Sequence, residues 1–188
     1  MSAWEGRLLV ATPALDPASG EGTFARTVIQ LLQHSADDGA LGVVVNRPTG
    51  NDLREVLPGW ALLAPDPPVI FEGGPVQQTA TICLGRLSGP APGDASYVGV
   101  AGAPWLATVD LDQDAAEPVQ EVRVFAGYAG WAPGQLEAEV QEGSWWVLDA
   151  LPGDCFNTTP ELLWRLVLRR QGLPLALAAS YPDDPALN

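Results

Sequence analysis

The sequence predicts an α+β protein in which strands dominate and helices come late in the chain. Short apolar runs that end at glycine- or proline-rich turns are typical of strands, and they recur over most of the sequence. Clear helical spacing is confined to the C-terminal part, and helices and strands do not alternate regularly as in a doubly wound sheet. With 188 residues, of which 47% are hydrophobic, we expect a single domain over residues 1–188.

The N-terminal half is expected to consist mainly of strands joined by turns. Segment 27–34 is ambiguous, because its apolar residues would also line one face of a helix. An Asp-Gly turn and a second apolar run follow it, as in a β-hairpin, and this favours a strand. We expect strands at 7–11, 27–34, 42–46, 69–72 and 79–84, a short helix at 51–57, and loops at 16–23 and 85–93.

The C-terminal half carries the clearest helices. Pro133 suits the first turn of a helix that Gly143 ends. The last helix has the strongest signals, since Thr159 can cap it, Pro160 can open it and Gly172 can end it. We also expect strands at 97–100, 107–111, 119–126 and 144–149, and an acidic turn at 112–118.

The charge of the chain argues against nucleic-acid and anionic-membrane partners. The sequence has 9 basic and 23 acidic residues, a formal net charge of −14 at pH 7. DNA-binding proteins draw much of their affinity from basic side chains that neutralise phosphates, so direct DNA binding is not expected. The N-terminus lacks the pattern of a secretory signal, and no apolar run is long enough to span a membrane, which predicts a cytoplasmic protein.

The two cysteines do not indicate a metal site, and no cofactor is expected. They form no CxxC pair or Cys/His cluster. In the cytoplasm both thiols would stay reduced. Cys83 lies in an apolar run and is expected to be an inert core residue, whereas Cys155 lies in a predicted loop and is the more accessible candidate.

Three glycine- and proline-rich turns are the most informative features of the chain. They are Asn46-Arg47-Pro48, Phe71-Glu72-Gly73-Gly74-Pro75-Val76 and Gly127-Tyr128-Ala129-Gly130-Trp131-Ala132-Pro133-Gly134-Gln135-Leu136. Turns at strand ends collect at one edge of a sheet, and glycine lets a ligand or another chain approach closely. We therefore expect one concavity, with His34 close by and a charged contact between Arg47 and Glu72. The predicted ligand-binding residues are Asn46, Arg47, Glu72, Gly73, Gly74, Tyr128 and Trp131.

A purely structural role stays open for each of these segments. The Gly-Gly turn would then be a tight turn between strands, and the segment around Tyr128 a packed strand-to-helix corner. Trp145 and Trp146 are adjacent in a predicted strand and should face opposite sides of the sheet.

Catalytic signals are sparse. His34 is the only histidine and therefore the only candidate for a histidine base, with Glu72 as a second acid/base candidate. The alternative is that His34 makes a structural hydrogen bond near a turn, within reach of the strand that ends at Asn46. There is no GxSxG elbow, and the spacing of the glycines fits neither GxGxxG nor GxxxxGKS/T, so no phosphate loop is expected.

A series of short motifs runs through nearly the whole chain in a fixed order. They are Gly6–Pro13, Asp16-Pro17, Phe24–Val28, His34, Gly39–Pro48, Phe71–Val76, Phe125–Trp131, Gln135-Leu136 and Asp184–Asn188. In this order and spacing they resemble the AlgH/YqgE family of bacterial proteins. Residues 18–22 look like an insertion relative to the family, and Leu41 and Ala186 stand where many members have Met and Ser.

The resemblance implies an α+β fold with a bifurcated β-sheet curled into a pseudo-barrel and flanked by helices. It implies no established catalytic residue, cofactor or substrate. Some members of the family are labelled transcriptional regulators, a label that describes phenotype rather than mechanism.

The sequence favours a non-catalytic regulatory protein that binds a small molecule or a protein partner and acts without direct DNA contact. The alternative is a cofactor-independent enzyme acting on a small polar substrate with His34 and Glu72, and a further alternative is a protein-interaction module that uses exposed tryptophans. An enzyme should bring His34 and Glu72 within hydrogen-bond reach. A binding protein should show an apolar pocket, and an interaction module a large exposed apolar patch.

Overall fold

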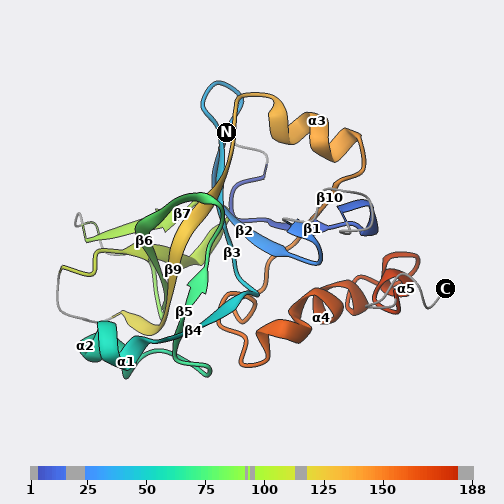
Figure 1. Ribbon diagram of the computed structural model, residues 1–188. Coiled ribbons are helices and arrows are strands. Elements are labelled where there is room, and N and C mark those ends of the chain that lie inside the picture. The colour runs from blue at the N-terminus through green and yellow to red at the C-terminus, as the bar shows by residue number, and fades with distance from the viewer. Residues whose placement is uncertain (1–3, 16–23, 92, 94–95, 113–117, 182–188) are drawn as a thin grey trace.

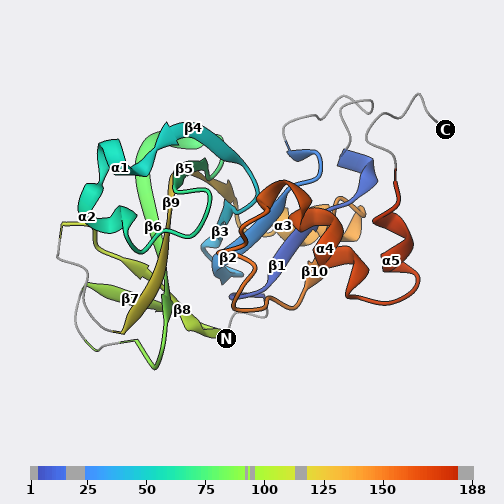
Figure 2. The same ribbon diagram turned by 90° about the horizontal axis from the view of Figure 1, so that it is seen from below.

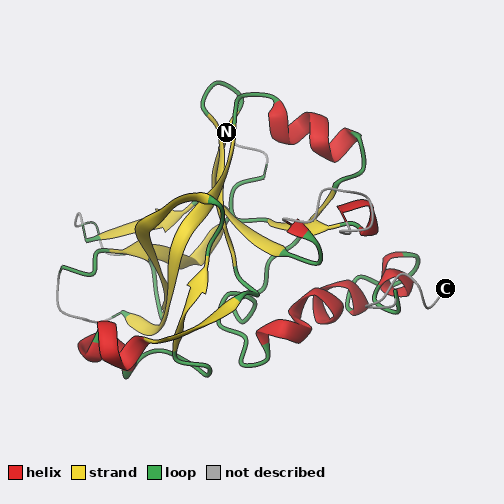
Figure 3. Ribbon diagram, viewed as in Figure 1, coloured by secondary structure: helices red, strands yellow, loops and turns green. Residues whose placement is uncertain are grey.

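Strands form one branched sheet at the centre of the protein, and short helices lie around it (Figure 1; Figure 3). The computed structural model describes residues 4–15, 24–91, 93, 96–112 and 118–181. The strands are β1 (Leu8–Ala11), β2 (Val28–Ser35), β3 (Gly39–Val44), β4 (Pro48–Asp52), β5 (Val69–Glu72), β6 (Val76–Leu87), β7 (Tyr97–Val100), β8 (Ala103–Val109), β9 (Val119–Trp131) and β10 (Trp145–Leu148).

The helices are short and lie at the periphery. They are α1 (Leu53–Val56), α2 (Pro58–Ala61), α3 (Gln135–Gln141), α4 (Leu163–Arg169) and α5 (Leu175–Ala178), with 3-10 turns at Pro13–Leu15 and Pro160–Leu162. Within the described part of the chain, no helix is both long and apolar enough to cross a membrane.

The sheet is mostly antiparallel and does not close into a barrel. Its strands follow the order β10-β1-β2-β3-β9-β6-β8-β7, while β5 is a parallel neighbour of β9 and also pairs with β4. The mixture of an open antiparallel sheet and irregularly placed helices confirms the predicted α+β class.

The sheet branches at β9, a strand of 13 residues. Around Phe125 and Ala126, β9 lies between β5 and β6, whereas from Ala129 to Trp131 its neighbour is β3. Gly127 stands between the two stretches with a φ of +71°, a left-handed conformation that L side chains rarely adopt. Gly73 links the two strands that diverge at the branch, β9 and β3. Its N–H donates to the Ala126 carbonyl of β9, and its carbonyl accepts from the Val44 N–H of β3, both at 2.8 Å. Glycines therefore make this branch point possible.

Most predicted strands are confirmed, including the β2–β3 hairpin in place of a helix at 27–34. Three predicted element boundaries were wrong, in each case because a strand extends further along its hydrogen-bonded neighbour than its own sequence indicates. β6 continues to Leu87 into the predicted loop because β8 and β9 flank it, and β9 continues to Trp131 because β3 joins it. The start of the predicted helix at 51–57 belongs to β4, which pairs with β5. The predicted loop at 16–23 and most of the acidic turn at 112–118 lie outside the described residues.

The ends of the helices differ in detail from the predicted ones. Pro133 precedes α3 instead of lying in its first turn, and Gly134 is the N-cap residue, with a φ of +77°. Thr159 makes no side-chain capping hydrogen bond, and Pro160 opens a 3-10 turn that leads into α4. Gly172 follows α4 with a φ of +75°, as its C-terminal position favours, but the chain then forms α5, which the sequence did not predict.

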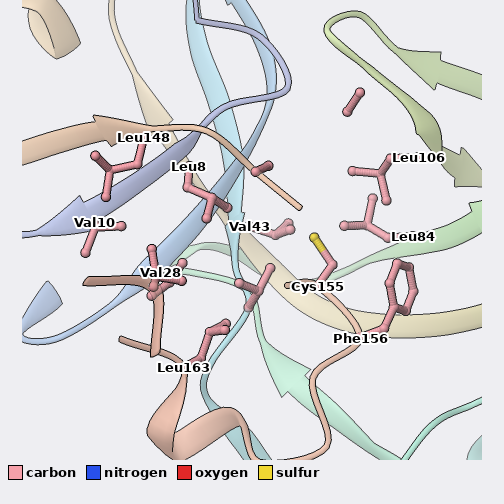
Figure 4. Close-up of a cluster of buried hydrophobic side chains, with 14 of the residues drawn as sticks. Leu8, Val10, Val28, Val43, Leu84, Leu106, Leu148, Cys155, Phe156 and Leu163 are labelled. Carbon is pink, nitrogen blue, oxygen red and sulfur yellow. The ribbon is translucent and has the colours of Figure 1, made fainter. Parts of the chain in front are cut away.

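Alternate residues of β1 face two different cores. Leu8 and Val10 pack in the core that includes α4, and Leu9 and Ala11 pack in the core that includes α3. Figure 1 shows α3 and α4 on opposite sides of β1 and β10, and Figure 4 shows the first core, in which Cys155 and Phe156 also lie. Burial on both faces explains why β1 is a continuous apolar run rather than an alternating one.

Trp145 and Trp146 belong to these two different cores, which confirms that they face opposite sides of the sheet. A third core lies at the other end of the molecule, where Leu53 and Trp60 of α1 and α2 pack with residues of β9 such as Val122. Figure 2 shows α1 and α2 beside the β4–β9 end of the sheet and the other helices around its β1–β10 end.

A buried cation ties loops to β9. Arg123 is 2% exposed, and its guanidinium donates to the backbone carbonyls of Pro65, Asp66 and Asn157. It also lies 4.2 Å from the ring centre of Phe71. Burial lowers the pKa of Arg123 to about 10. The guanidinium thus donates its hydrogen bonds to the backbone within the fold.

Candidate functional site

The three predicted turns meet at the branch point of the sheet. The Glu72 N–H donates to the Arg47 carbonyl at 2.9 Å, which joins the first turn to the second. A Cβ atom on Gly73 would lie 2.2 Å from the Gly127 carbonyl oxygen, and one on Gly74 would lie 2.3 Å from the Tyr128 carbonyl carbon. The second and third turns therefore touch backbone to backbone. The Gly-Gly turn is not a hairpin, since β5 and β6 lie on opposite edges of β9.

The polar side chains of this junction bind groups within the fold. Asn46 Oδ1 accepts from the Val28 N–H and its Nδ2 donates to the Arg26 carbonyl, both at 2.9 Å. Arg47 and Glu72 form the expected charged contact, with 3.8 Å between Nη1 and Oε1. The glycines therefore make close backbone contacts, and Asn46, Arg47 and Glu72 each have a side-chain contact within the fold.

His34 and Glu72 do not form a hydrogen bond or an ion pair with each other. His34 Nε2 lies 2.9 Å from Glu137 Oε1 of α3, and its ring stacks on Trp4 with 4.9 Å between ring centres. His34 is 8% exposed, and its Nδ1 has no hydrogen-bond partner among the described residues. His34 pairs with Ala40 of β3, the hairpin arm that leads to Asn46, as expected. Its side chain makes a structural hydrogen bond, but with Glu137 of α3, which the sequence did not indicate.

Both cysteines are free and buried. Burial raises the pKa of the Cys83 thiol to about 12. The expectation that Cys155 would be accessible is wrong: it is 2% exposed, its Sγ donates to Gln30 Oε1 at 3.4 Å, and burial and the nearby Asp154 raise its pKa. The loop that carries Cys155 folds into the first core, so both thiols are enclosed by packing.

A pocket of about 610 Å³ lies between α3, β10 and the turn that precedes β6. This volume falls within the usual range for small-molecule sites. Of the seven predicted site residues, Trp131 lines this pocket. The lining residues are Leu15, Phe24, Pro75, Val76, Gly130, Trp131, Gln135, Glu139, Glu142, Ser144 and Trp145.

Glu139 fixes the two tryptophans of the pocket. Its Oε2 accepts the indole N–H of both Trp131 and Trp145 at 2.8 Å, and its Oε1 accepts from the Gln135 amide at 2.9 Å. The two indole planes are nearly perpendicular, at 83° with 6.0 Å between ring centres, and Phe24 meets Trp145 edge-on at 5.5 Å. A buried indole N–H needs a partner, and one carboxylate supplies it for both rings.

Glu139, Trp145 and Phe24 are not among the residues predicted for the site. One local signal was available, since Gln135 and Glu139 are four residues apart and share a helix face. The contact with Trp145 has no local signal, because it depends on α3 folding back between β9 and β10. In the part of the chain that the structure describes, no three His, Cys, Asp or Glu side chains are arranged to hold a metal ion.

Together, the fold and this pocket define an α+β protein with a branched, open sheet and an aromatic-lined site. A family model described as AlgH-like matches residues 8–176. A UPF0301 protein from Streptomyces avermitilis is 48% identical over 195 aligned residues, which cover 100% of this chain and 97% of the relative. A UPF0301 protein from Streptomyces coelicolor is also 48% identical, over 100% of this chain and 97% of the relative.

Two solved structures are similar over nearly their full length. The crystal structure of protein DIP2367 from Corynebacterium diphtheriae has a TM-score of 0.85 and 31% identity, covering 96% of this chain and 94% of that one. The solution structure of the AlgH protein from Pseudomonas aeruginosa has a TM-score of 0.63 and 29% identity, covering 95% and 94%. The chain belongs to the AlgH-like family, which confirms the resemblance seen in the sequence.

Proposed function

We propose that this protein binds a small molecule in the pocket beside α3, without catalysing a reaction, and acts as a cytoplasmic regulator that does not contact DNA directly. The observation that carries the proposal is the arrangement in which Glu139 holds Trp131 and Trp145 at a fixed angle in the wall of a 610 Å³ pocket. Pre-organised aromatic walls with few polar groups are typical of small-molecule sites. A net charge of −14 supports action without direct DNA contact.

Two features favour binding over catalysis and over protein docking. A general acid or base must reach the substrate within hydrogen-bond distance, whereas His34 is bound to Glu137 and its Nδ1 is enclosed. The seven tryptophans, all within the described residues, are buried or only partly exposed. This argues against an interaction surface made of exposed indoles, and it suits rings that form the wall of a small site.

Native mass spectrometry of the protein purified from its own host tests the proposal. We expect a small molecule bound to the wild-type chain and to Trp105→Phe, a matched control because Trp105 packs in the first core and does not line this pocket. Trp131→Phe removes one indole N–H from Glu139 and should lose most of the bound molecule. Circular dichroism would verify that both variants are folded. An empty wild-type chain, or equal retention by both variants, contradicts the proposal.

A further inference from the structure

We propose that the ligand of this pocket is a small organic cation, in which an amine or quaternary ammonium group is joined to an apolar body. The inference rests on the proposed function and adds the chemical class of the ligand. It follows from the charges that line the pocket, from the way in which the indole N–H groups are used, and from the apolar character of the remaining wall.

The charged residues that line the pocket are acidic. Glu139 and Glu142 contribute two carboxylates, and no arginine is among the described residues that line the pocket. The three side-chain groups that donate to Glu139 are neutral, and neither glutamate forms an ion pair with a described residue. Among the described residues, no basic side chain balances their negative charge. Glu139 is only partly exposed, so its field is screened less than that of a surface group.

The indole donors of the wall are already in use. The indole N–H groups of Trp131 and Trp145 both point to Glu139, and the Gln135 amide also donates to it. The described wall supplies no guanidinium, and its further side-chain donors are the Ser144 hydroxyl and the second N–H of Gln135, so a bound phosphate or carboxylate would meet few donors and would be repelled by the two glutamates. The pocket thus disfavours an anionic ligand.

The rest of the wall fits an apolar body. Leu15, Phe24 and Val76 line the pocket together with the two indoles, and Trp131 and Trp145 are 7% and 3% exposed. Rings that are this buried and tied to one carboxylate lose little freedom when a ligand binds.

A series of three probes with similar bodies and different charge tests the inference. Phenethylammonium, phenethyl alcohol and phenylacetate carry positive, zero and negative charge, and isothermal titration calorimetry would measure their dissociation constants. We expect the ammonium to bind on the order of tenfold more tightly than the alcohol, and phenylacetate more weakly than either. Raising the salt concentration should weaken the ammonium alone.

Variants that remove a carboxylate test whether Glu139 and Glu142 cause the preference for the ammonium probe. Glu139→Gln and Glu142→Gln should each reduce the ammonium-to-alcohol preference, and the double variant should bring the two affinities close together. Glu55→Gln is the matched control, because Glu55 is an exposed glutamate on α1 and does not line the pocket. Its preference should equal that of the wild type.

Equal binding of ammonium and alcohol, tighter binding of phenylacetate, or no binding of any probe would overturn the inference. The proposed function fails separately. A neutral or anionic molecule retained by Trp105→Phe and lost by Trp131→Phe would leave the binding function standing and remove only the cationic class of the ligand. A wild-type chain without any bound molecule, combined with no response to the three probes, would remove both.

Discussion

Replacing Gly127 by alanine should destabilise the protein at the point where the sheet branches. The residue has a φ of +71°, and a Cβ atom there would lie 2.5 Å from the Gly74 carbonyl oxygen and 2.9 Å from that of Val76. The left-handed conformation costs about 1–2 kcal/mol for an L residue. Relieving the overlap requires β9 to move away from the turn before β6, a form of overpacking that costs about 1–3 kcal/mol. We therefore expect a loss of about 2–5 kcal/mol.

Two other glycines separate these contributions. Gly172 has a similar φ of +75°, but a Cβ atom there would have nothing within 4 Å, so Gly172→Ala should cost only about 1–2 kcal/mol. Gly50 has open space and no positive φ, so Gly50→Ala should change stability by less than about 0.5 kcal/mol. The difference between Gly127→Ala and Gly172→Ala measures the backbone contact at the branch point.

Urea unfolding followed by tryptophan fluorescence would measure the free energy of unfolding of each variant. For a chain of this size, the expected loss in Gly127→Ala corresponds to a decrease in Tm of between about 4 and 20 °C. If Gly127→Ala and Gly172→Ala lose the same free energy of unfolding, the close backbone packing at the branch point does not require glycine at position 127.

Arg123→Met should lower the free energy of unfolding, measured in urea, by about 2–4 kcal/mol, because it leaves the carbonyls of Pro65, Asp66 and Asn157 without their donor. The control Arg169→Met, at the exposed end of α4, should change it by less than about 0.5 kcal/mol. Equal losses in the two variants would show that the buried guanidinium does not stabilise the fold. Burial raises the pKa of Cys83 from 9.0 to about 12. Above pH 9 this thiol is therefore ionised in the unfolded chain but still protonated in the folded protein. The free energy of unfolding should then fall as the pH rises, by up to about 1.4 kcal/mol per pH unit for each such thiol. Urea unfolding between about pH 8 and pH 10 should therefore show a shallower decrease for Cys83→Ala than for the wild type, and an identical slope would mean that this thiol is not buried in the folded state.

Local sequence patterns were enough to predict the elements that pack against segments nearby in the sequence. The Asp-Gly turn separated two strands from a helix at 27–34, and the hairpin of β2 and β3 is present. The spacing of Leu163, Val167 and neighbouring residues likewise indicated α4, which the structure contains. In these cases hydrophobic periodicity and turn chemistry carry the information, and both are properties of a short window of sequence.

The boundaries of β4, β6 and β9 could not be predicted from local patterns, because each strand extends as far as its partner strand does.

The side-chain contacts of the site likewise depend on residues that are far apart in the sequence. The sequence alone determined the α+β class, the family, the absence of a phosphate-loop motif and the convergence of three glycine-rich turns. It could not show that Glu139 binds Trp131 and Trp145, that His34 lies against Glu137, or that Cys155 is buried.

Those contacts arise when α3 folds back over the sheet and when the loop before α4 enters the first core. They join residues from different elements, and no local propensity specifies their distance. Tertiary packing alone therefore decided where the pocket lies, which carboxylate holds its walls, and which of the predicted residues lie at the branch point of the sheet.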